Sequence, residues 1–205
     1  RTSMKRTWIK NARIVNEGKT HEGSLVICDE EIEAIYEGDE APSVPCDETI
    51  DAEGAYLLPG VIDDHVHFRD PGLTHKADMH TESMAAVAGG VTSYMDMPNT
   101  NPQTTSIEAL NNKFEDAAQK SVANYSFYFG ATNDNEGLIP HLDKQRICGI
   151  KLFMHICGKR LSKTYLHQSN ALIYHLHRNL GKYANQENLI CIITERSKRF
   201  RKETV

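Results

Sequence analysis

The sequence predicts an α/β fold: the first half of a TIM-like (β/α)8 barrel, preceded by a small antiparallel β domain. Three observations indicate this. Residues 5–55 contain short runs of alternating apolar and polar residues separated by glycines. From residue 56, strand-like and helix-like segments alternate, as in right-handed βα units of a parallel sheet. One apolar run ends in two histidines, and a barrel gathers such side chains at the carboxyl ends of its strands.

The predicted N-terminal β domain covers residues 4–55. Its strand-like runs are separated by turns at Gly18, Gly23 and Gly38. The apolar runs are 8–9, 13–15, 24–27 and 31–36.

The first half of the barrel is assigned to residues 56–154. Strands are expected over 57–67, 91–97, 124–130 and 147–154, and helices over 76–88, 105–120 and, briefly, 136–143. In the first helix the apolar positions are Met79, Met84, Ala85, Val87 and Ala88, and Gly89-Gly90 ends it. The second helix begins with a capping-box pattern, Thr105 to Glu108.

Composition is that of a soluble globular protein, with 40% hydrophobic and 25% charged residues. No apolar run approaches the about 18–20 residues that span a bilayer, so no membrane partner is expected. The five cysteines are odd in number and scattered, which favours reduced thiols and a cytoplasmic location.

His65 and His67 are the most informative pair in the chain. They lie two positions apart at the end of the first barrel strand, so both imidazoles point to one face. Two imidazoles so placed form half of a divalent-metal site. The alternative is a strand that carries two histidines with other hydrogen-bond partners.

Lys151 is the second candidate metal ligand, because it interrupts the apolar strand Gly149-Ile-Lys-Leu-Phe-Met154. A buried lysine is costly unless it is paired, neutralised or modified. Its neutral amine can add carbon dioxide and become a carbamate with two oxygen donors. The alternative is a buried stem whose amine reaches the surface.

Three blocks in order resemble one family. His65-Val-His67-Phe-Arg69-Asp-Pro-Gly72, Gly89-Gly90-Val-Thr92 and Asp96-Met-Pro98-Asn99-Thr100 are similar to the opening of dihydroorotases of the amidohydrolase superfamily. Gly-Ile-Lys151-Leu-Phe-Met also resembles the fourth-strand motif of this group, and the resemblance runs over residues 5–154. It implies a metal-dependent hydrolase barrel beside a small β-sandwich.

The resemblance also implies the site and the reaction. His65, His67 and a carboxylated Lys151 would bind two zinc ions, with Lys151 as the bridge. Arg69 and Asn99 would hold the substrate carboxylate, although Arg69 could instead pair with Asp70 or Asp63. The reaction would be reversible hydrolysis and cyclisation between L-dihydroorotate and N-carbamoyl-L-aspartate, in pyrimidine biosynthesis. No catalytic acid or base is identified, since the resemblance places that aspartate beyond residue 205. Asp96 could orient a ligand indirectly.

Residues 155–205 depart from the resemblance. They carry 10 Lys and Arg against 3 Asp and Glu, whereas residues 1–154 carry 13 against 25. We expect this basic tail to be a shifted reading frame or another corruption, and the chain as written to be incomplete and inactive. A competing interpretation makes 171–177 the fifth strand. Nucleic-acid binding would depend on charge alone and is not expected.

Two alternative functions remain at this point. One is another cyclic amidase, such as a dihydropyrimidinase, hydantoinase or allantoinase. The other is a non-catalytic dihydroorotase-like scaffold, which metal content would distinguish from an enzyme. A homodimer is the default expectation for the assembly.

Overall fold

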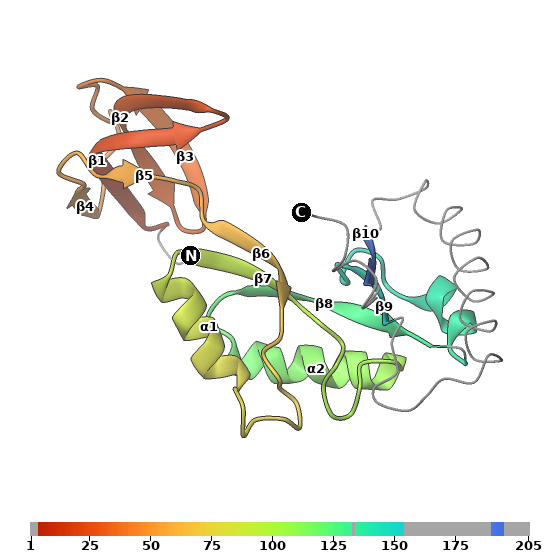
Figure 1. Ribbon diagram of the computed structural model, residues 1–205. Coiled ribbons are helices and arrows are strands. Elements are labelled where there is room, and N and C mark those ends of the chain that lie inside the picture. The colour runs from red at the N-terminus through yellow and green to blue at the C-terminus, as the bar shows by residue number, and fades with distance from the viewer. Residues whose placement is uncertain (1–3, 133, 154–189, 195–205) are drawn as a thin grey trace, which may run out of the picture. The chain divides into compact units, whose positions relative to one another are not determined.

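The computed structural model describes residues 4–132, 134–153 and 190–194. The chain divides into two compact units, residues 1–60 and 61–205 (Figure 1). The sequence places the division after residue 55, whereas the contacts place it after residue 60. The reason is that β5 (Tyr56–Leu57) pairs with Arg13 and Ile14 of the first strand.

The first unit contains a five-stranded sheet. β1 (Arg6–Asn16), β2 (Lys19–Cys28) and β3 (Glu31–Glu37) pair antiparallel, in the order β3-β2-β1. β4 (Glu48–Asp51) and β5 pair parallel to β1, so a wholly antiparallel sheet was the wrong expectation. β4 therefore runs in the same direction as β3, whereas a hairpin between them would make the two strands antiparallel. The second sheet of a sandwich stays a prediction.

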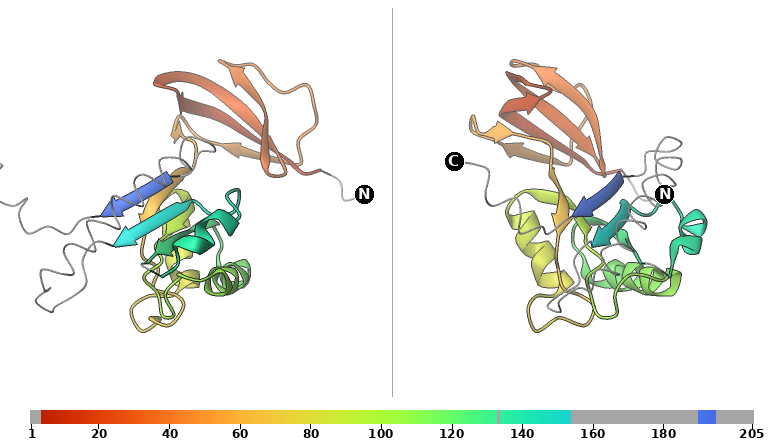
Figure 2. Two further views of the ribbon diagram at one scale, coloured as in Figure 1. Left: turned by 90° about the vertical axis from the view of Figure 1, so that its right-hand side faces the viewer. Right: turned by 45° about the vertical axis from the view of Figure 1, so that its right-hand side comes forward.

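The second unit contains a half-barrel of parallel strands. Its strands are β6 (Val61–Val66), β7 (Val91–Asp96), β8 (Asn124–Ala131), β9 (Gly149–Phe153) and β10 (Ile190–Thr194). They lie in the order β10-β9-β8-β7-β6, so each strand pairs with the next along the chain. Figure 2 shows β9 and β10 side by side. β10 was not predicted from the sequence, because it lies in the segment that was expected to be corrupted.

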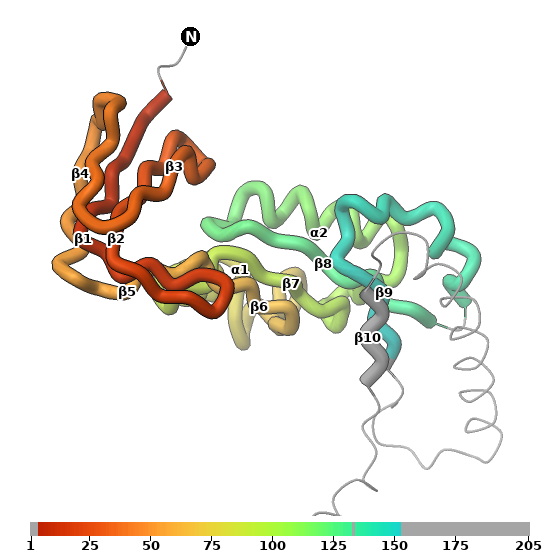
Figure 3. Tube along the Cα trace, turned by 90° about the horizontal axis from the view of Figure 1, so that it is seen from above, coloured from red at the N-terminus to blue at the C-terminus, as the bar shows by residue number. Residues whose placement is uncertain are grey.

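Two helices cover one face of this sheet. α1 (Met79–Ala88) packs on β7 and α2 (Ile107–Lys120) on β8, as Figure 3 shows from above. A 3₁₀ helix, η1 (Glu136–His141), leads toward β9. Between sheet and helices lies an aromatic core in which the Phe68 and Tyr94 ring centroids are 4.3 Å apart. Its other large members are Phe114, Phe127, Phe129, Met79, Leu110 and Ile150.

Two local expectations were wrong. The run 57–67 is broken at residues 58–60, so β6 starts only at Val61 and His67 lies one residue past its end. The N-cap of α2 is Ser106, not Thr105, because Ser106 has extended backbone and accepts from the Ala109 N–H. On α1, Met79 and Ser83 form the buried face, whereas Met84 and Val87 are 52% and 44% exposed.

Cys28, Cys46 and Cys148 are free thiols. Burial raises the pKa of Cys148 to about 12, so this thiol stays protonated. Among the described residues, no helix is both long and apolar enough to cross a membrane. The tail residues 155–189 and 195–205, including the alternative strand at 171–177, lie outside the described residues.

Candidate active site

The candidate site lies on the face of the half-barrel that the helices leave uncovered. Val66, Phe127 and Ile150 point toward the helices, as part of or against the aromatic core. Because side chains alternate along a strand, His65, Tyr128 and Lys151 point to the opposite face. The Tyr128 hydroxyl donates to the Asp64 carbonyl at 3.0 Å, so its ring reaches across β7 from β8 to β6. The strand order therefore brings the first and fourth sequence motifs to one face.

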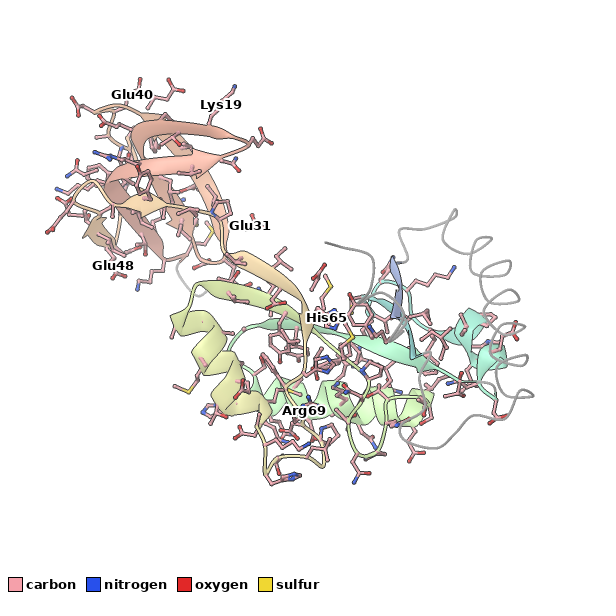
Figure 4. All side chains as sticks on the ribbon, in the orientation of Figure 1. Lys19, Glu31, Glu40, Glu48, His65 and Arg69 are labelled. Carbon is pink, nitrogen blue, oxygen red and sulfur yellow. The ribbon has the colours of Figure 1, made fainter. Side chains whose placement is uncertain are left out.

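His65 lies near the carboxyl end of β6 (Figure 4), and His67 follows just after this strand. Their ring centroids are 5.4 Å apart and the rings are tilted by 51°. Burial lowers the pKa of His65, and the charges of Lys151 and His67 lower it further. His65 is therefore neutral at pH 7, which is the form of imidazole that binds metal ions.

Lys151 lies on β9, beside Gly130 of β8 in the strand register. Its side chain is almost fully buried, and burial lowers the pKa of the amine. A lowered pKa increases the fraction of neutral amine, the form that reacts with carbon dioxide. The environment thus favours the carbamate that the resemblance implies, and the carbamate itself stays a prediction.

Arg69 and Asn99 lie on the loops that follow β6 and β7. Asn99 Oδ1 lies 2.8 Å from His67 Nδ1, so the amide contacts a predicted metal ligand directly. The Asn101 N–H donates to the Pro71 carbonyl at 3.0 Å and ties the two loops together. Figure 4 shows Arg69 on the loop beyond His65.

The alternative ion pair of Arg69 is not formed within the described part of the chain. Asp70 instead pairs with Lys120 Nζ at 3.2 Å and accepts from the Met79 N–H. The Asp63 carboxylate accepts from the His65 N–H at 3.1 Å. Among the described residues, the carboxylate of Asp70 therefore pairs with Lys120 rather than with Arg69.

Lys113 is a residue that the sequence analysis missed. It lies on α2 with no exposed surface, and its Nζ is 2.7 Å from Asp96 Oδ2. Asp96 Oδ1 accepts from the backbone N–H of Phe68, the residue between His67 and Arg69. Helical spacing was the available signal, because position 113 falls on the same face as Leu110 and Phe114.

The donor set fits a divalent cation through two imidazoles. When Nδ1 of His67 bonds to Asn99, its Nε2 remains available to bind a cation. The lowered pKa of His65 favours its neutral, metal-binding form. Over residues 4–132 and 134–153, His, Cys, Asp and Glu form no cluster of three that could hold a metal. Among the described residues, the two imidazoles of His65 and His67 lie together, and their role as metal ligands stays a prediction.

Comparison with known proteins shows which families the chain resembles. A family model described as dihydro-orotase-like matches residues 54–139. Residues 54–139 are a dihydroorotase-like segment of the amidohydrolase superfamily. The dihydroorotase of Methanothermobacter thermautotrophicus is 38% identical over 117 residues, which cover 56% of this chain and 26% of that protein. The dihydroorotase of Streptococcus pyogenes is 46% identical over 88 residues, 42% of this chain and 21% of that protein.

Solved structures place the dihydroorotase-like segment among related folds. The L-hydantoinase (dihydropyrimidinase) from Arthrobacter aurescens has a TM-score of 0.71 at 26% identity, covering 91% of this chain and 40% of that chain. A D-hydantoinase from Bacillus sp. AR9 has a TM-score of 0.67 at 25% identity, covering 91% and 39%. The chain spans about a quarter of the length of the dihydroorotases it matches.

Proposed function

We propose that this chain carries the metal-binding and carboxylate-binding parts of a zinc-dependent dihydroorotase site. The reaction is the reversible conversion of L-dihydroorotate into N-carbamoyl-L-aspartate, a step of pyrimidine biosynthesis. One observation carries the proposal: His67 contacts Asn99 at 2.8 Å, so the predicted metal ligands and the predicted carboxylate clamp form one site. The proposed ligands of two zinc ions are His65, His67 and a carboxylated Lys151.

In this proposal the chain's own residues bind and orient the substrate. Arg69 offers a planar fork of donors that matches a carboxylate, and the Asn99 amide nitrogen is a further donor because its oxygen faces His67. Together they would fix the ring amide of the substrate over His65 and His67. A bound zinc ion would polarise the amide carbonyl and lower the pKa of a water molecule.

A second candidate is a hydantoinase-type cyclic amidase. The solved structures with TM-scores of 0.71 and 0.67 are hydantoinases, which supports a shared fold and a shared amide chemistry. Hydantoin itself has no carboxylate, so it gives Arg69 no anionic partner. Carboxylate dependence of ligand binding therefore separates the two candidates.

The test measures zinc content and ligand binding of the purified 205-residue chain. We expect zinc to bind, and N-carbamoyl-L-aspartate to bind more tightly than hydantoin in calorimetry. Arg69→Lys keeps the charge but loses the fork, so it should weaken binding of N-carbamoyl-L-aspartate by about ten- to hundred-fold. Arg13→Lys, in the first unit, is the matched control and should change nothing. Absence of bound zinc, or equal binding of the two ligands, contradicts the proposal.

A further inference from the structure

The ion pair of Lys113 and Asp96 is the most deeply buried charged contact among the described residues. The two side chains are 0% and 1% exposed, and their charged atoms lie 2.7 Å apart. Lys113 Nζ also donates to the Met97 carbonyl at 3.0 Å and lies 4.6 Å from the centroid of the Phe127 ring. A buried ion pair is often no more stabilising than apolar residues of similar volume. Stability alone therefore does not explain this pair.

The pair anchors a short segment, residues 96–99, that encloses His67. Asp96 Oδ1 accepts from the Phe68 N–H at 2.9 Å, just after the histidine. The Met97 N–H donates to the Val66 carbonyl at 3.0 Å, just before it. Asn99 contacts the imidazole itself. The same segment thus holds the backbone on both sides of His67 and one nitrogen of its ring.

We propose that Lys113 and Asp96 are positioning residues: they fix residues 96–99 so that His67 points Nδ1–H toward Asn99 and presents Nε2 to a cation. The backbone bonds set the position of the ring, and the Asn99 oxygen selects the tautomer. The binding of a cation by His67 rests on the proposed function. The tautomer of His67 does not, because it is a property of the metal-free chain.

The first measurement is nitrogen-15 NMR of the histidine rings in the metal-free 205-residue chain. The pH is set about two units above the ordinary imidazole pKa. We expect His67, assigned by its loss in His67→Gln, as the Nδ1–H tautomer. In Lys113→Met the tautomers should be mixed. Asp96→Asn combined with Lys113→Met leaves no unpaired buried charge, and should fold and also show the mixture.

The matched control is Phe114→Leu, which trims the core side of α2 next to Lys113 without touching residues 96–99. It should lower the melting temperature and leave the His67 tautomer unchanged. Equal disturbance of His67 by Phe114→Leu would overturn the proposal, because general loosening of α2 would then be the cause. A wild-type chain with His67 as the Nε2–H tautomer would also overturn it.

The second measurement is zinc affinity by competition with a coloured chelator. Lys113→Met and the double variant should bind zinc about ten- to hundred-fold more weakly than the wild type. Phe114→Leu should stay within about twofold of the wild type. If zinc affinity and the His67 tautomer are unchanged in both Lys113→Met and the double variant, the proposal is wrong. If the tautomer changes as expected but even the wild type binds no zinc, the positioning role stands and the proposed function fails.

Discussion

Gly72 illustrates how one residue sets the loop that carries Arg69. Its φ of +81° favours glycine, and an added Cβ would meet the carbonyl oxygen of Asn101 on the neighbouring loop. Gly90 has a similar φ of +89° but open space around it. Gly72→Ala should therefore cost more than Gly90→Ala, whose cost is about 1–2 kcal/mol from backbone strain alone.

Urea unfolding of both glycine variants measures this difference. We expect the lower midpoint in Gly72→Ala, together with weaker N-carbamoyl-L-aspartate binding in the molecules that remain folded. Equal midpoints would mean that the contact between the two loops contributes nothing to stability.

Some residues of the candidate site could be proposed from the sequence alone. His65 and His67 were found because the spacing of two places both rings on one face, and Lys151 because a charge interrupts an apolar strand. Lys113 was missed because a lysine on an amphipathic helix is ordinarily solvated. Its partner Asp96 comes from another element, and such a pairing depends on tertiary packing.

Helix caps decide where α2 begins. The Ser106 side chain accepts from the Ala109 N–H at 3.1 Å, so Ser106→Ala should destabilise the chain by about 1 kcal/mol. Thr105→Ala is the control, since Thr105 was the cap expected from the sequence and the structure gives that role to Ser106. Thermal unfolding separates the two variants. If Thr105→Ala lowers the stability more than Ser106→Ala does, Thr105 is the N-cap of α2 after all.

The cap of α1 gives a pH-dependent prediction. The hydrogen bond from the Thr81 backbone N–H holds the pKa of Asp78 below its ordinary value of 3.8. A carboxylate with a lowered folded-state pKa contributes its full stability above the ordinary value and loses it as pH falls through the folded one. Asp78→Asn keeps a capping oxygen that does not titrate.

Melting temperatures of the wild type and Asp78→Asn across pH measure this contribution. The advantage of the wild type should be constant near neutral pH and should shrink below about pH 4. A difference that does not change with pH would show that the Asp78 charge is irrelevant to the cap.

Elements with local signals were predicted well. β7 was expected over 91–97 and is Val91–Asp96, and the expected stop of α1 at the glycine pair is confirmed by the cap at Gly89. The exposure of Met84 and Val87 on α1 was not predicted, because it depends on the packing of other segments. For the same reason the parallel pairing of β4 and β5 was missed, since pairing direction is a long-range property.

At the scale of the whole molecule, β6 is an edge strand of the half-barrel within the described part of the chain. In the part of the chain that the structure describes, β6 pairs with β7 alone, and Val61 and Ile62 are 53% and 62% exposed. An exposed apolar edge strand is a template for association with another chain. The homodimer expected by default would then have a physical cause in this edge.

Ile62→Lys tests this cause, because a charged side chain on an edge strand opposes strand pairing. We expect the wild type to self-associate with rising concentration in sedimentation velocity, and Ile62→Lys to remain monomeric at concentrations about tenfold higher. The matched control is Val122→Lys, since Val122 is 54% exposed but lies between α2 and β8 rather than on the β6 edge. If Val122→Lys suppresses association equally, added charge rather than the β6 edge controls it.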